Sequence, residues 1–235
     1  MLTRRAALTA GLAFAVSFAR ESSAQDRPRI KNWLELRNEH VVIQQHDYSC
    51  GSAALSTMFR YYFQDNVPEA RVLQVIFLRL AQRPDGREQV VDRVKQGLSM
   101  LDLKLAAIEL GYQAEAAKIP LKTLATVDAP VIVRIEEEGF KHFVIFRGVL
   151  EDRVFLADPI RGNLRIPISK FNMIWTKVDG SFVSHAGEDV ARPALFLGKE
   201  GFGLPKEHPL TVTQPIPFIE IKAARDNLYR PLPSR

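Results

Sequence analysis

The sequence predicts an α+β protein in which helices come first along the chain and an antiparallel sheet follows. Two observations carry this prediction. Apolar residues recur at helical spacing between about residues 50 and 110, whereas short apolar runs separated by turn signals occupy residues 112–168. Because consecutive strands with short connections pair antiparallel, this separation of helices from strands favours the α+β class.

Composition divides the chain into three segments. Residues 1–24 combine the pair Arg4-Arg5, an apolar run and small residues at 22–24, which is the pattern of an export signal peptide. Residues 25–197 are expected to form one domain, and residues 198–235 a tail whose six prolines preclude long regular elements. We therefore expect a protein exported to the periplasm or the cell exterior, and the arginine pair is compatible with the twin-arginine route. The alternative is a signal retained as an N-terminal membrane anchor.

Charge and motif content exclude several functional classes. The net charge is +5, and removal of a signal with three arginines and one glutamate leaves +3, with no basic stripe interleaved with aromatic residues. Nucleic-acid binding is therefore not expected. The sequence contains no Gly-x4-Gly-Lys-Ser/Thr motif, so ATP binding is not expected either. No cofactor or metal is expected, because the acids at 136–138 have no His or Cys beside them at ligand spacing.

Four helices are expected in the first half of the domain, at residues 50–63, 68–82, 87–96 and 100–110. Apolar residues cover most of the second helix, so we expect it to pack on more than one side. Ser99 and Asp102 form the pattern of a capping box before the fourth helix, and Gly111 ends it. Upstream, Trp33, Leu34 and Leu36 are expected to anchor the N-terminal segment to the domain. Residues 41–43 are expected to be an extended segment that brings Gln44 to the candidate active site around Cys50.

The second half is expected to supply the sheet. Strands are predicted at residues 112–116, 130–135, 141–149, 153–157 and 164–168, with further segments near 182–183 and 195–197 and a short helix at 120–124. The acidic run 136–139 is expected to be a solvated hairpin tip. Ser169 is expected to cap a turn that carries Phe171, Ile174 and Trp175.

Cys50 is the only cysteine, and it lies at the expected start of a helix. Unpaired backbone N–H groups and the helix macrodipole favour a thiolate at that position. A lone cysteine is more often a small buried hydrophobe. In an oxidising compartment, however, an unpaired thiol must be buried or used, and the polar lead-in of residues 44–49 favours use as a nucleophile.

A nucleophilic thiol needs a base and a group that orients the base. His142 begins an apolar strand, and Asp158 ends the next strand, so an antiparallel hairpin brings the two to the same end of the sheet. An isolated histidine in such a strand is more often a hydrogen-bonded core residue. His46 is expected to be a rim residue, and the remaining histidines lack a strand and an acid nearby.

An oxyanion donor is also needed. A glutamine amide could donate to the oxyanion beside the backbone N–H of Cys50, and both Gln44 and Gln45 are candidates. The residue types alone do not separate them.

Three motifs in order carry a resemblance to a known family. They are Gln44-x5-Cys50-Gly51-x-Ala53, Lys141-His142-Phe143-Val144 and Ala157-Asp158-Pro159. Over about residues 41–175 the chain resembles the bacteriocin-processing cysteine peptidases, papain-like enzymes that cut peptide leaders after a Gly-Gly pair. The resemblance implies a papain-like fold with Cys50 as nucleophile at a helix start, His142 as base, Asp158 as its orienter and, by spacing to the cysteine, Gln44 as oxyanion donor.

The departures from the family shape the expected function. Ser49 stands where the family commonly has an acid, and the expected export signal moves the chemistry outside the cytoplasm. The resemblance therefore implies a stand-alone exported peptidase, expected to be monomeric, that cuts a peptide or protein at a small-residue site and serves a secretion or surface-fibre system. The alternatives are an inactive relative that binds a client or leader peptide, and another thiol amidase or acyl transferase.

Overall fold

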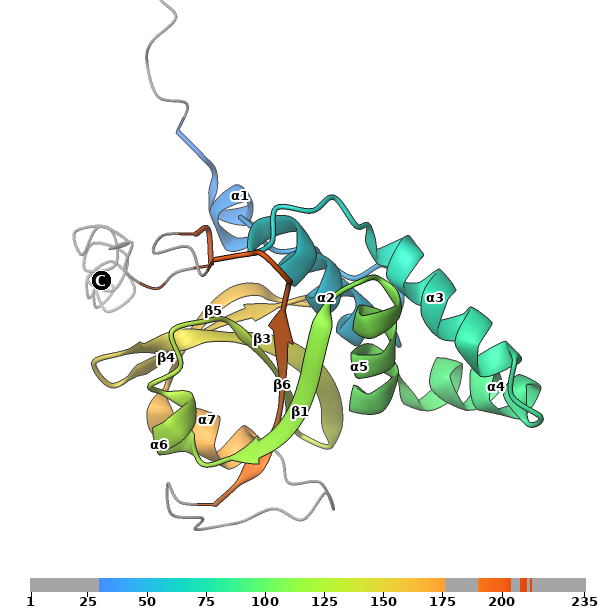
Figure 1. The fold of residues 1–235 in the computed structure, drawn as a ribbon. Coiled ribbons are helices and arrows are strands. Elements are labelled where there is room, and N and C mark those ends of the chain that lie inside the picture. The colour runs from blue at the N-terminus through green and yellow to red at the C-terminus, as the bar shows by residue number, and fades with distance from the viewer. Residues whose placement is uncertain (1–29, 176–189, 204–207, 211, 213–235) are drawn as a thin grey trace, which may run out of the picture. The chain divides into compact units, whose positions relative to one another are not determined.

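The computed structural model describes residues 30–175, 190–203, 208–210 and 212 (Figure 1). The unit that begins at Asn32 contains all the elements named below. The helices are α1 (Trp33–Arg37), α2 (Cys50–Tyr61), α3 (Glu69–Ala81), α4 (Gly86–Gln96), α5 (Met100–Glu109), α6 (Leu121–Leu124) and α7 (Ile168–Ile174). The strands are β1 (Gln113–Ile119), β2 (Val131–Glu137), β3 (Phe140–Leu150), β4 (Arg153–Asp158), β5 (Gly162–Pro167) and β6 (Arg192–Gly198).

The described strands form a single antiparallel sheet in the order β1-β6-β2-β3-β4-β5. Strands β2 to β5 follow one another through short turns, whereas β6 returns from later in the chain and pairs between β1 and β2. Helices before the sheet and consecutive antiparallel strands within it confirm the α+β prediction.

The sheet separates two apolar cores. Because side chains alternate along a strand, Phe143 and Ile145 of β3 point into a core shared with α2, α3 and α5, whereas Val144 and Phe146 point into a second core shared with α6 and α7. In Figure 1, α6 and α7 lie on the opposite side of the sheet from α3 and α5. β3 is thus packed on both faces, which fixes the strand that carries His142.

The helical half follows the sequence closely. The predicted capping box is confirmed, because Ser99 accepts a hydrogen bond from the Asp102 N–H and the Asp102 carboxylate accepts one from the Ser99 N–H. Gly111 follows α5 with φ +90°, a conformation that glycine adopts without strain. α3 contacts α2, α4 and α5, as its apolar circumference predicted. Pro68 caps α3 instead of starting it.

The N-terminal anchors were predicted wrongly. Trp33, Leu34 and Leu36 are 68%, 56% and 46% exposed. The segment is held instead by its backbone, because Asn163 Nδ2 donates to the Glu39 carbonyl at 2.7 Å. Next to it, Gly162 has φ +77°, and a Cβ there would lie 2.4 Å from the Arg37 carbonyl oxygen. Polar backbone contacts of this kind leave no apolar signature in a sequence.

Two local predictions also differ from the structure. Ser169 lies inside α7, and Pro167 is the capping residue. The acids at 136–138 do not form a solvated tip, because β2 continues to Glu137; Glu136 is buried, Glu137 is ion-paired and only Glu138 is exposed in the turn. The strand predicted near 182–183 lies outside the described residues.

Beyond Gly198, the described residues pack onto the domain. Lys199 Nζ lies 2.7 Å from an Asp65 carboxylate oxygen, the Phe202 ring contacts Tyr62, and Leu210 is fully buried in the helical core. These residues are therefore wrapped along the body. Among the residues that the structure describes, no helix has the length and apolar character needed to cross a bilayer.

Candidate active site

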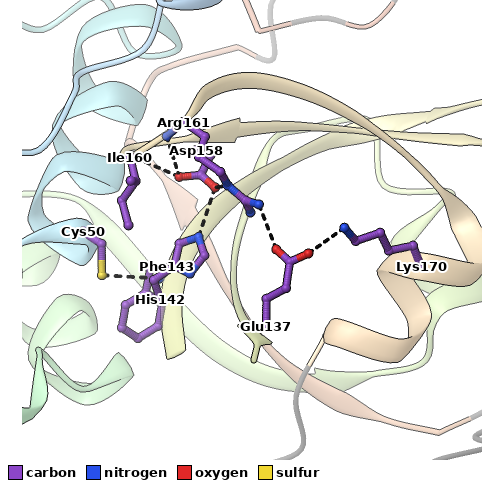
Figure 2. Close-up of polar contacts among 8 residues, drawn as sticks. All are labelled: Cys50, Glu137, His142, Phe143, Asp158, Ile160, Arg161 and Lys170. Carbon is purple, nitrogen blue, oxygen red and sulfur yellow. Dashed lines mark hydrogen bonds and ion pairs between the residues drawn. The ribbon is translucent and has the colours of Figure 1, made fainter. Parts of the chain in front are cut away.

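Cys50 is the first residue of α2, as predicted. Every residue from Cys50 to Phe59 is buried, so the helix is held by packing on both sides of its first turn. The Cys50 side chain is 5% exposed, and its Sγ accepts a hydrogen bond from the Phe143 N–H at 3.4 Å (Figure 2). The thiol of α2 is thereby attached directly to β3.

Gly51 makes this close approach possible. A Cβ at this position would lie 2.7 Å from Leu103 Cδ2 and 3.1 Å from Phe143 Cδ2. Both distances are shorter than ordinary van der Waals contacts, so a larger residue would force the Leu103 and Phe143 side chains to shift. The glycine after Cys50 therefore lets α2 pack closely against Leu103 and Phe143.

The thiol is not activated by its helix alone. Burial raises the pKa of Cys50, the Phe143 and Gly51 N–H groups partly offset this effect, and the negative charge of Asp158 adds to the rise. The N–H groups at the helix start lower the pKa of Cys50 as expected, but burial outweighs them. Desolvation disfavours a thiolate unless a positive charge lies close to it.

His142 and Asp158 meet as the strand pairing predicted. His142 Nε2 lies 3.0 Å from Asp158 Oδ2; the imidazole is 4% exposed and the carboxylate is fully buried. His142 Nδ1 is buried and has no hydrogen-bond partner in the described structure. Because Nε2 faces Asp158, Nδ1 is the ring nitrogen that remains to accept a proton.

Asp158 is fixed from several directions. Its Oδ1 accepts hydrogen bonds from the Ile160 N–H at 2.8 Å and the Arg161 N–H at 3.1 Å, and its Oδ2 accepts one from Arg161 Nε at 2.8 Å. Burial alone would raise the pKa of Asp158, but the bond to His142, its charge, and the Ile160 and Arg161 donors lower it to about 2. The carboxylate is therefore ionised and can stabilise an imidazolium.

Arg161, Glu137 and Lys170 extend this arrangement, and sequence reasoning missed all three. Arg161 Nη1 lies 2.8 Å from Glu137 Oε2, and Lys170 Nζ lies 2.6 Å from Glu137 Oε1 (Figure 2). The available signal was an arginine three residues after Asp158 in a turn, a spacing at which the two can pair.

Gln44 reaches the site through its backbone. Its N–H donates to the Pro159 carbonyl at 2.9 Å, which attaches the loop before α2 to the residue after Asp158. Its side-chain Nε2 donates to the His46 carbonyl at 2.9 Å, and since an amide nitrogen carries two N–H groups, one remains for another acceptor. Gln45 is exposed, and its N–H donates to Glu69. The role of Gln44 as oxyanion donor stays a prediction.

The other histidines lie in different surroundings. His46 is exposed and stacks on Tyr48, as expected for a rim residue. His40 and His208 contact the rings of Tyr61 and Tyr62. His185 lies outside the described residues.

A cavity of about 360 Å³ opens beside His142. It is lined by Glu137, Glu138, Phe140, His142, Ile160 and Arg161. His142 is therefore reachable from this side even though most of its surface is covered. Among the described residues, no group of three or more His, Cys, Asp or Glu side chains could hold a metal ion.

Comparison with known proteins gives a family match for part of the chain. Residues 88–179 match the model of the Peptidase C39 family, a stretch that contains His142 and Asp158 but not Cys50. The protein named "Probable functional amyloid protease FapD" from Pseudomonas fluorescens is 34% identical over 151 residues, which cover 64% of this chain and 63% of that protein. The protein of the same name from Pseudomonas aeruginosa is 28% identical over 167 residues, 71% of this chain and 70% of that protein. The chain thus spans less than two thirds of the first relative.

Among solved structures, the peptidase domain of Streptococcus ComA, a bi-functional ABC transporter, matches with a TM-score of 0.50 and 20% identity. The match covers 68% of this chain and 98% of that domain. This likeness shows the fold, and the predicted papain-like fold is confirmed. Residues 88–179 thus match the peptidase C39 family, and this match together with the FapD relatives supports the resemblance of the chain to the bacteriocin-processing peptidases.

Proposed function

We propose that the protein is an exported cysteine peptidase that uses Cys50 as nucleophile, His142 as general base and acid, and Asp158 to orient the imidazole. One observation carries the proposal: His142 of β3 pairs with the buried Asp158 of β4, and the next residue of β3, Phe143, binds the Cys50 sulfur through its N–H. Two consecutive residues of β3 thus connect the proposed nucleophile on α2 with the proposed orienter on β4.

In the proposed reaction, the Sγ proton of Cys50 moves to His142 Nδ1. The thiolate attacks the peptide carbonyl carbon, and the oxyanion receives hydrogen bonds from the Gln44 amide and the Cys50 N–H. The C–N bond then breaks as His142 returns its proton to the leaving amine. Water, deprotonated by His142, hydrolyses the thioester and restores the thiol.

The charges around the site support this sequence of steps. A buried thiol is a poor nucleophile until a cation forms beside it. The ionised Asp158 stabilises the protonated imidazole of His142, and this imidazolium is the cation. Thiolate and imidazolium therefore form together.

For the substrate, we propose a protein of a surface-fibre system that is cut at a glycine or alanine. The likeness to proteins named functional amyloid proteases supports this class. Residues 1–24, read as a signal peptide, support action outside the cytoplasm.

The test is to mix the chain from residue 25 onward with fibre-subunit precursors and their neighbouring gene products, and to map new termini by mass spectrometry. Cleavage by the native protein and none by Cys50→Ala is the expected result. Cleavage by Cys50→Ala at the native rate would overturn the proposal. Equal unfolding temperatures of the two proteins would exclude a folding defect as the cause.

A second candidate is a protein that binds a client or leader peptide without cutting it, and the raised pKa of Cys50 favours it. In that case the native protein and Cys50→Ala would bind the same precursor with equal affinity, and neither would release a product. Titration of a labelled precursor, followed by mass spectrometry of the same samples, separates the two candidates.

A further inference from the structure

We propose that Arg161 and Glu137 are positioning residues that set the pH range of the active site. Arg161 holds the Asp158 carboxylate and competes with His142 for it, and Glu137 moderates the charge of Arg161. This inference rests on the proposed peptidase function and deepens it.

The competition concerns a single oxygen atom. Asp158 Oδ2 lies 3.0 Å from His142 Nε2 and 2.8 Å from Arg161 Nε. The other oxygen, Oδ1, is held by two backbone N–H groups in the turn after β4. The carboxylate therefore cannot turn toward the imidazole alone, and the guanidinium takes up part of its charge.

Glu137 in turn holds Arg161. Its two carboxylate oxygens contact different cations, Arg161 at 2.8 Å and Lys170 at 2.6 Å. These groups come from β2, from the turn between β4 and β5, and from α7, so three elements fix the arrangement (Figure 2). The Lys170 and Arg161 hydrogen bonds lower the pKa of Glu137 despite its partial burial, so it is ionised.

The charged and titratable groups around His142 come from each element packed near it. They are Cys50 on α2, Asp158 on β4, Arg161 in the following turn, Glu137 on β2, Glu138 in the β2–β3 turn, Lys170 on α7, and Lys141 of β3 with its partner Glu136. Among these groups, Arg161 is the cation that contacts the same Asp158 oxygen as His142.

The two residues should act in opposite directions. Without the charge of Arg161, Asp158 holds the imidazolium more strongly and the thiolate loses a nearby cation. The acidic and the basic limb of the pH–rate profile should therefore both move to higher pH. Without the charge of Glu137, Arg161 acts uncompensated, so both limbs move to lower pH. For partly exposed charges a few ångströms away, we expect shifts of about 0.5 to 1 pH unit.

The experiment compares full-length native protein with Arg161→Gln and Glu137→Gln. Two profiles are measured from pH 4 to 10: the rate of Cys50 alkylation by iodoacetamide, and kcat/KM on the mapped substrate. The alkylation profile needs no substrate, so it tests this inference even if the protein proves to cut nothing. Arg153→Gln is the control for Arg161→Gln, and Glu115→Gln is the control for Glu137→Gln. Each removes a charge of the same sign from an ion pair outside the site.

Opposite shifts of the two variants, with both controls native, are the expected result. Arg161→Lys keeps the charge but loses the forked donor, so it should keep the native pH limbs and lower kcat. Shifts in the same direction, or none, in folded variants would overturn the inference. If Arg161→Gln fails to fold, the other two variants test the inference. It then requires a pH profile that moves to lower pH in Glu137→Gln and stays at the native pH in Arg161→Lys.

Discussion

The two sides of the active site hold their groups by different means. On the helical side, Cys50 is surrounded by apolar side chains and backbone N–H donors, and its pKa is raised by burial. On the sheet side, His142 faces a chain of ionised groups that runs through Asp158 and Arg161 to Glu137. In the proposed mechanism, the thiolate of Cys50 therefore depends on the imidazolium of the sheet side for a stabilising charge, whereas the helix mainly fixes its position.

Removal of the base is expected to have the largest effect. His142→Gln should lower kcat/KM by about 10³-fold or more, because the thiol then lacks a proton acceptor and a cation. Steady-state cleavage of the mapped substrate measures the loss. His46→Gln is the control, since this exposed residue should leave the rate near native. A His142→Gln protein as active as native would show that the sheet side does not supply the base or the cation.

Asp158→Asn should follow, with a loss in kcat/KM of about 10²-fold, because an amide keeps the shape of the carboxylate but not its charge. The loss should fall mainly on kcat, since Asp158 is fully buried. Separate kcat and KM values check this. A variant that changes only KM would assign Asp158 to substrate binding instead.

The same carboxylate should make stability depend on pH. Its pKa of about 2 lies below the ordinary value, so its contribution is present above the unfolded pKa of about 4 and is lost as the pH falls toward 2. The shift corresponds to about 2 kcal/mol of unfolding free energy. Urea unfolding at pH 7 and pH 2.5 should show a smaller acid loss in Asp158→Asn than in the native protein. Equal losses would contradict the assignment.

Gly51→Ala should have the smallest effect, a loss of about 1 kcal/mol in unfolding free energy, because overpacking against Leu103 and Phe143 exceeds the gain in helix propensity. Gly203→Ala is the control, since a Cβ there meets nothing within 4 Å. Thermal unfolding compares the two. A stabilised Gly51→Ala would show that the approach of α2 to β3 is looser than described.

The sequence predicted those features that rest on local chemistry or on regular spacing. The helix that starts at Cys50, the capping box at Ser99 and the meeting of His142 with Asp158 follow from periodicity and antiparallel pairing, and the structure has all three. Tertiary contacts were not predictable in this way. Glu137 reads as part of an acidic turn, and only the folded sheet reveals that β2 carries it to Arg161.

The pKa of Cys50 illustrates the same limit. The position at a helix start is visible in the sequence and favours a thiolate, but the burial that outweighs it depends on how α2, α5 and β3 pack. Likewise, the exposed Trp33 shows that an apolar residue near a domain's edge need not anchor it.

The most direct measurement is the pH dependence of Cys50 alkylation by iodoacetamide in the native protein and in His142→Gln. If the sheet supplies the charge that stabilises the thiolate, the native protein should react rapidly below pH 7. The variant should then react only above the ordinary thiol range of about 8.5, because burial and Asp158 still oppose ionisation. Coincident curves for the two proteins would show that the helix alone activates the thiol and would contradict the account.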